Sequence, residues 1–144
     1  MTAGDRQFCT FTLDELYLGV PAREVQEVLP SRDMTRVPLA PPGVRGLINL
    51  RGEIVPAIDL RHGLRLRAGE GRPMNVVVRT PDGPVSLLVD EIGDVLKVAE
   101  EAFEPPPEPV AAATRGLIRG VFKLRDRLLV ILDIDKIVAP EALR

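Results

Sequence analysis

The chain is poor in the side chains that many enzymes and metal sites depend on. Its 144 residues include one histidine, His62, one cysteine, Cys9, one tyrosine and no tryptophan. A lone histidine cannot supply a histidine pair for a metal, and it leaves no plausible Ser-His-Asp arrangement. A lone cysteine excludes an internal disulfide and a cysteine-rich zinc site, so we expect Cys9 to be a small buried strand residue in a reducing cytoplasm. We therefore expect no enzyme, no metal site and no cofactor.

Long apolar runs, abundant aromatics and an excess of positive charge are also absent. No apolar stretch approaches the length of a membrane-spanning helix, and no basic segment followed by an apolar one opens the chain. The formal net charge of −2 argues against bulk attraction to nucleic acid or to an anionic membrane. The scarcity of aromatics removes the stacking platforms that single-stranded nucleic acids use. We expect a soluble, cytoplasmic protein that binds no nucleic acid and does not insert into a membrane.

The most informative stretch is residues 44–60, VRGLINLRGEIVPAIDL. Two apolar runs rich in Ile and Val are joined there by Arg51, Gly52 and Glu53. Apolar runs of this length, broken at a glycine, are typical of β-strands. A glycine in such a short break suits the positive φ of a tight hairpin turn. The sequence therefore predicts a β-hairpin with Arg51 at its turn.

The same hairpin occurs twice. Residues 120–134, GVFKLRDRLLVILDI, match residues 46–60 without a gap, and Arg125 falls on Arg51. Upstream, residues 23–29 resemble residues 90–96, and a proline-rich connector follows each. Matched elements in the same order indicate an internal repeat. We infer two structurally similar halves.

The remaining pattern predicts a mainly β protein of about ten short strands, with no strand–helix–strand crossover. Residues 23–29 are expected to form a short helix, because Val25, Val28 and Leu29 have the i, i+3, i+4 spacing of one helical face. Residues 90–96 repeat that spacing. We expect a single domain over residues 1–144, with two small closed sheets as lobes. The lobes would be residues 8–66 and 74–138, joined by the loop 67–73.

These residues carry a resemblance to a known family. GLINLRG at 46–52 and IVPAIDLR at 54–61 resemble the most characteristic stretch of the CheW family of bacterial chemotaxis coupling proteins. Residues 23–27, 88–95 and 124–136 fall where that family has similar segments, so the resemblance covers essentially the whole chain. It implies two five-stranded SH3-like β-barrel lobes related by the internal repeat, with a few short helices, on a common apolar core.

The resemblance also implies a function. Such proteins are non-catalytic adaptors that couple transmembrane chemoreceptors to a histidine kinase and help to build receptor arrays. The kinase's own regulatory domain is similar, but this chain carries no kinase or receiver domain, which favours the free-standing adaptor. The expected partners are the helical hairpin tip of a chemoreceptor and the regulatory domain of the kinase. We expect the protein to be monomeric alone and to enter mixed rings only with the kinase domain present.

The resemblance places receptor binding in the groove between the barrels and near the central hairpin. Position by position, it points to Val25, Glu27, Gly46, Arg51, Met74 and Val95. Val25 and Val95 could instead be core residues, and Gly46 could serve only the backbone. Glu27 and Arg51 are better candidates, because charged residues are rarely buried unless paired. We predict that these two side chains form an ion pair at the rim of the groove.

A second function from another class remains open. A double β-barrel could hold a small molecule between its lobes and have no scaffold role. A pocket lined by convergent polar groups would favour that function, whereas an exposed apolar groove beside Glu27 and Arg51 would favour the adaptor.

Overall fold

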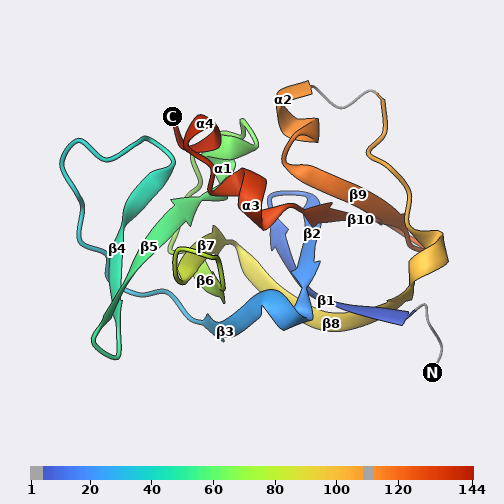
Figure 1. Ribbon diagram of the computed structural model, residues 1–144, viewed down its shortest axis with the longest axis horizontal. Coiled ribbons are helices and arrows are strands. Elements are labelled where there is room, and N and C mark those ends of the chain that lie inside the picture. Colours follow the sequence, from blue (N-terminus) through green and yellow to red (C-terminus); the bar gives the residue numbers. More distant parts are fainter. Residues whose placement is uncertain (1–4, 109–111) are drawn as a thin grey trace.

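The computed structural model describes residues 5–108 and 112–144. This part of the chain is mainly β, with two five-stranded sheets and a few short helices, as predicted (Figure 1). The strands are β1 (Asp5–Leu13), β2 (Leu16–Pro21), β3 (Val25–Leu29), β4 (Val44–Leu50), β5 (Glu53–Asp59), β6 (Met74–Val78), β7 (Val85–Val89), β8 (Glu91–Ala99), β9 (Ile118–Lys123) and β10 (Leu128–Leu132). The helices are the 3₁₀ turns η1 (Ala22–Glu24) and η2 (Glu100–Ala102), and the short helices α1 (Leu60–Gly63), α2 (Ala112–Arg115), α3 (Ile134–Ile137) and α4 (Pro140–Leu143).

The two sheets have matching topologies. Sheet A has the strand order β8-β1-β2-β10-β9, and sheet B has the order β3-β6-β7-β5-β4. The hairpin β1–β2 thus takes the place in sheet A that β6–β7 takes in sheet B. One parallel pairing in each sheet, β2 with β10 and β7 with β5, joins this hairpin to the other strands. The two halves of the chain therefore exchange their first hairpins.

This exchange corrects the predicted lobes. Residues 8–66 and 74–138 do not correspond to the two sheets, because β1 and β2 pair with strands of the second half and β6 and β7 with strands of the first. A sequence repeat shows which segments are alike. It does not show which strands pair, because a strand has the same local sequence pattern whether its partner lies in the same half or in the other half. The three-residue turn η1 leads the chain directly from β2 in sheet A to β3 in sheet B.

The internal repeat itself is confirmed. Hairpins β4–β5 and β9–β10 lie in different sheets and share one strand register. Asp59 and Asp133 follow the second strand of each hairpin, and their side chains cap α1 and α3. Each carboxylate also forms an ion pair with an arginine of the first strand of its hairpin. Asp59 lies 3.6 Å from Arg45, and Asp133 lies 3.8 Å from Arg119. Equivalent residues thus make equivalent interactions in the two halves.

The predicted short helices at 23–29 and 90–96 are wrong, since these residues form η1 and β3, and β8, respectively. The few apolar residues of this segment do not distinguish the two structures, because short apolar patterns are ambiguous between helix and strand. A helix of this length is unstable alone. The open edges of β6 and β1 offer backbone hydrogen bonds instead, and β3 and β8 pair with them.

The largest group of buried apolar side chains is shared by the two sheets. Its members come mostly from β1, β2, β5, β6, β7, β10, α1 and α3: Phe11, Leu13, Leu18, Val20, Ile58, Leu60, Leu64, Val76, Val78, Leu87, Val89, Leu117, Leu132, Ile134 and Ile137. Each sheet also encloses a smaller cluster, around Phe122 in sheet A and Ile48 in sheet B. Removal of this apolar surface from water holds the sheets against each other.

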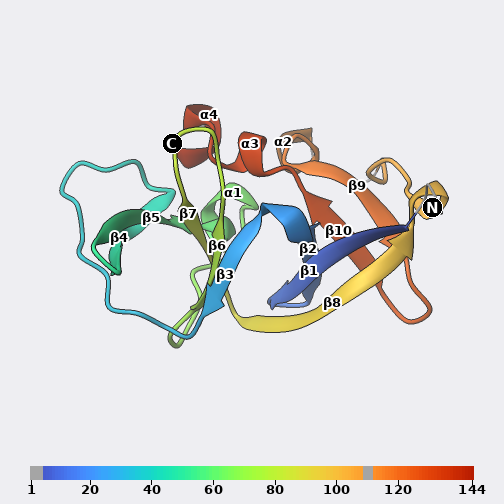
Figure 2. The same cartoon turned by 60° about the horizontal axis from the view of Figure 1, so that its bottom comes forward.

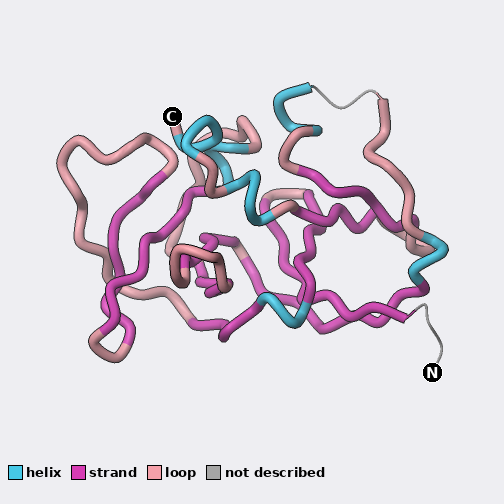
Figure 3. The backbone as a smooth tube through the Cα atoms, viewed as in Figure 1, coloured by secondary structure: helices cyan, strands magenta, loops and turns pink. Residues whose placement is uncertain are grey.

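Two of the edge strands lie on the side of the molecule opposite to three of the short helices. Figure 2 shows the edge strands β3 and β8 on one side, with α1, α3 and α4 on the other. Figure 3 shows the long connectors, from β3 to β4 and from β8 to β9, at opposite ends. Both connectors return along their own hairpins, where Thr35 pairs with Leu47 and Glu104 with Val121.

Candidate functional site

The turn of the central hairpin places Arg51 in an unusual backbone conformation. Arg51 has φ +53° and Gly52 has φ +88°, which are the two left-handed positions of a two-residue hairpin turn. Asn49 supports the turn, because its Oδ1 accepts a hydrogen bond of 2.8 Å from the N–H of Gly52. A left-handed arginine is uncommon, and such outliers concentrate at functional sites. Arg125 at the equivalent turn does not have a positive φ.

Arg51 and Glu27 form the ion pair that the sequence predicts. Arg51 Nη2 donates to Glu27 Oε2, linking the β4–β5 turn to β3 at the edge of sheet B. This hydrogen bond lowers the pKa of the Glu27 carboxyl below its usual range, and the charge of Arg32 adds to the effect. Arg51 stays 66% exposed, whereas Glu27 is 23% exposed. The pair holds a solvent-facing guanidinium in one direction.

Gly46 is needed where the first connector crosses β4. It is buried, and a Cβ there would lie 2.9 Å from the carbonyl oxygen of Thr35 and 3.2 Å from Met34 Cβ. Thr35 and Leu47 exchange two backbone hydrogen bonds of 2.8 Å at this crossing. Gly120 has the same role in the other half, under the connector at Phe103 and Glu104. The absence of a side chain lets each connector approach its hairpin.

A partly buried arginine links the two sheets. Arg61 follows β5 of sheet B, and its guanidinium donates to Asp90 Oδ1 at 2.9 Å and Oδ2 at 3.0 Å. It also donates to Asp14, in the β1–β2 turn of sheet A. These bonds lower the pKa of Asp90, and only 12% of the Arg61 side chain is exposed. We call Arg61, Asp14 and Asp90 the inter-sheet clasp.

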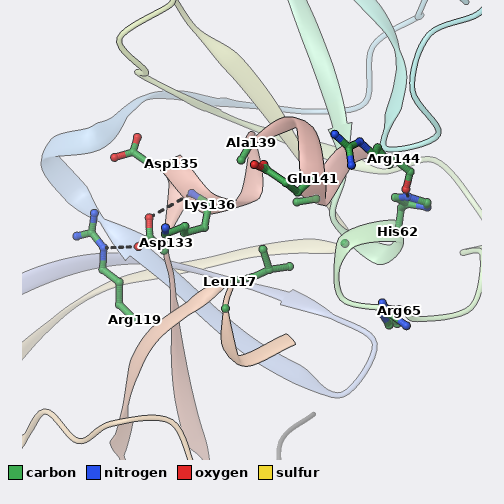
Figure 4. Close-up of a pocket in the computed structure, with 13 residues that line it drawn as sticks. His62, Arg65, Leu117, Arg119, Asp133, Asp135, Lys136, Ala139, Glu141 and Arg144 are labelled. Atoms are coloured by element: carbon green, nitrogen blue, oxygen red, sulfur yellow. Dashed lines mark hydrogen bonds and ion pairs between the residues drawn. The ribbon is translucent and has the colours of Figure 1, made fainter. Parts of the chain in front are cut away.

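A hollow of about 820 Å³ lies on the helical side of the molecule (Figure 4). Its apolar lining includes Leu117, Ala139 and Ala142, and charged side chains surround them. Arg119 faces Asp133 there, and His62 Nε2 contacts the carbonyl oxygen of Arg144. The remaining lining residues are Gly63, Arg65, Gly116, Asp135, Lys136 and Glu141.

The described residues also bear on metal binding and on membrane insertion. Within residues 5–108 and 112–144, no group of three or more His, Cys, Asp and Glu side chains is placed to hold a metal ion. Over the same residues, no helix has the length and apolarity to span a membrane.

Comparison with known proteins assigns the family. A family model described as a CheW-like domain matches residues 7–141. The chain belongs to the CheW family.

Individual members of the CheW family are similar over nearly the whole chain. Chemotaxis protein CheW of Treponema pallidum is 30% identical, with 100% of this chain and 89% of the relative covered. Chemotaxis protein CheW of Bacillus subtilis is 34% identical, with 86% and 81% covered. The crystal structure of scaffolding protein TtCheW from Thermoanaerobacter tengcongensis superposes with a TM-score of 0.81 at 29% identity, covering 90% of this chain and 84% of that one.

The residues that the CheW resemblance marks for receptor binding separate in the structure. Glu27 and Arg51 are paired in sheet B, and Gly46 lies buried under the connector. Val25 and Met74 are partly buried and pack against the shared core. Val95 lies in β8 of sheet A and is 56% exposed. The structure thus brings Glu27 and Arg51 together and leaves Val95 on the other sheet.

Two exposed apolar residues of this CheW protein were missed in the sequence. Val28 of β3 is 46% exposed, and Ile54 of β5 is 57% exposed. Val28 follows Glu27, and Ile54 lies three residues after Arg51. Reading 25–29 as a strand would have placed Val28 on the opposite side from Glu27 and Leu29. The helical interpretation placed Val28 on the buried face instead.

Proposed function

We propose that this CheW-like protein is a non-catalytic adaptor that couples transmembrane chemoreceptors to a histidine kinase. Family membership supports a scaffold role in chemotaxis-type signalling, because the relatives are named chemotaxis proteins and the similar solved structure is a scaffolding protein. The receptor and kinase as partners are part of the proposal. The adaptor would work in the cytoplasm, in arrays that it joins through the receptors.

The Glu27–Arg51 pair carries the proposal. The pair leaves a directed guanidinium at the surface, and the neighbouring strands expose Val28 and Ile54. Arginine is enriched in protein interfaces, and the exposed apolar side chains on these two strands add apolar area to the candidate surface. The planar fork of arginine fixes the direction of its hydrogen bonds, which suits a carboxylate or carbonyl on a receptor helix.

The site residues then have different roles. We assign direct receptor contact to Glu27, Arg51 and Val95, which the structure leaves at least partly exposed. Val25 and Met74 support the surface by packing on the shared core, and Gly46 keeps the connector in place. The kinase regulatory domain would bind a different surface, so that both partners are held at once. Alone, the protein would be mostly monomeric.

Calorimetric titration with two soluble partners tests the coupling role. The chain is titrated with a receptor-tip fragment and, separately, with the regulatory domain of the kinase from the same organism. We expect saturable binding of each, and a complex of all three in size-exclusion chromatography. Binding of only one partner, or competition between the two, would reject coupling even though the chain is a CheW-like protein.

The hollow of about 820 Å³ on the helical side favours a second candidate function, the binding of a small molecule. Apolar side chains with a few convergent polar groups are typical of ligand pockets. An Ala139→Trp variant would fill this hollow. If the adaptor function is the main one, this variant binds receptor tip and kinase domain as the wild type does. Loss of both interactions, with the fold retained, would instead show that the hollow belongs to a partner-binding surface, and would count against the ligand-binding function.

A further inference from the structure

A second hollow, of about 530 Å³, is lined by four arginines. Arg32 and Arg36 come from the β3–β4 connector, Arg45 from β4, and Arg72 from the loop before β6. Asp33 is the only acidic residue among its lining residues. We call this the arginine hollow. Its charge contrasts with the net charge of −2 of the whole chain.

Carboxylates neutralise only part of this charge. Arg72 pairs with Asp33 at 3.1 Å, and Arg45 approaches Asp59 at 3.6 Å. Among the described residues, neither Arg32 nor Arg36 has an ion-pair partner within 4.0 Å. Arginine side chains that line one hollow repel each other, and a bound anion reduces that repulsion.

A neighbouring hollow of about 540 Å³ shares Arg45 and Arg72 with the arginine hollow and also contains carboxylates, but these do not pair with Arg32 or Arg36. Asp14 and Asp90 are engaged by Arg61 in the inter-sheet clasp. Glu70 and Glu91 line that neighbouring hollow and are absent from the lining of the arginine hollow.

The backbone that carries these arginines is anchored. Between Arg32 and Arg36, Met34 packs on the sheet B cluster around Ile48, and Thr35 exchanges two 2.8 Å hydrogen bonds with Leu47. The Arg72–Asp33 pair ties the loop before β6 to the same connector. The four arginines that line the hollow thus come from three chain segments, the β3–β4 connector, β4 and the loop before β6.

We propose that the arginine hollow binds a small dianionic oxyanion of the phosphate class, either inorganic phosphate or a small phosphate ester. Arginine presents two parallel N–H donors that match two oxygens of such an anion. The site is specific to one half of the repeat, because the equivalent connector carries four glutamates within residues 100–108. This proposal does not rest on the adaptor function.

Titration of the full chain with inorganic phosphate and with pyrophosphate tests the site. The protein is kept at low ionic strength in a phosphate-free buffer, and backbone amide shifts are followed by NMR, with chloride as the control anion. We expect saturable shifts confined to residues 31–36, 45 and 71–73, with pyrophosphate binding more tightly than phosphate. A phosphate ester such as glycerol phosphate, compared with inorganic phosphate, distinguishes the two sources of the anion.

Two variants and a matched control decide the assignment. Arg32→Ala and Arg36→Ala should each weaken phosphate binding at least tenfold, whereas Arg125→Ala, at an exposed turn of the other sheet, should leave it unchanged. Thermal melts check that all three variants are folded. Shifts no larger than those with chloride, shifts centred elsewhere, or equal losses in the three variants would each overturn the proposal.

Discussion

Replacement of Arg51 by alanine separates the functional role of the hairpin turn from its structural role. If the Glu27–Arg51 pair presents a guanidinium to the receptor, Arg51→Ala should weaken binding of a receptor-tip fragment by about 30-fold, the size of effect typical of an arginine hot spot. Calorimetric titration of the fragment measures this loss. Binding of the kinase regulatory domain should be unchanged.

The structure predicts little change in stability for the same variant. Arg51 is 66% exposed, and its backbone is already in the left-handed region, so an alanine Cβ adds no new strain. The melting temperature should shift by no more than about 2 °C. Arg51→Gly, which relaxes the left-handed position, should lose receptor binding to the same extent and be at least as stable as Arg51→Ala.

Arg125→Ala is the internal control, because Arg125 occupies the same hairpin position in sheet A without a left-handed backbone. We expect its receptor binding to remain within about twofold of wild type, well inside the loss expected for a hot spot. Arg51→Lys should recover only part of the affinity, since an ammonium group lacks the planar fork. Equal losses for Arg51→Ala and Arg125→Ala, or a folding defect in Arg51→Ala, would refute the assignment of Arg51 to the receptor site.

Three further predictions concern the framework around the site. Gly120→Ala should destabilise the protein by about 1–3 kcal/mol in urea unfolding, because the new Cβ would lie 2.3 Å from Phe103 Cζ. Gly46→Ala should destabilise it less, because the new Cβ would lie 2.9 Å from its nearest neighbour, the carbonyl oxygen of Thr35. Arg61→Ala should lower the free energy of unfolding by about 2 kcal/mol in the same assay. This is less than the loss expected on breaking a fully buried ion pair, because Asp90 is partly exposed. A loss near zero would show that the inter-sheet clasp is dispensable. Since the clasp lowers the pKa of Asp90, its stabilisation is present above about pH 4 and is lost as pH falls through the lowered pKa, so the stability difference between wild type and Arg61→Ala should shrink in acid.

The sequence alone determined the repeat and the paired hairpins. These features depend on local information. Alternation of apolar residues and a glycine at the turn specify a hairpin wherever it lies in the fold. The same is true of the caps, since Asp59 and Asp133 close the helical turn that directly follows each hairpin. The family resemblance added the Glu27–Arg51 pair and the other candidate receptor-binding residues. It did not give their arrangement, because Val95 and Arg51 lie on different sheets.

Only the tertiary structure decided which strands pair. The exchange of β1–β2 and β6–β7 between the halves leaves every local pattern unchanged, so no periodicity reveals it. Residues 25–29 fit a helix or a strand equally well until the edge of β6 supplies hydrogen bonds. The inter-sheet clasp and the arginine hollow are decided in the same way. The charged residues of each cluster are far apart in the sequence. They form a cluster only because the folded chain brings them together.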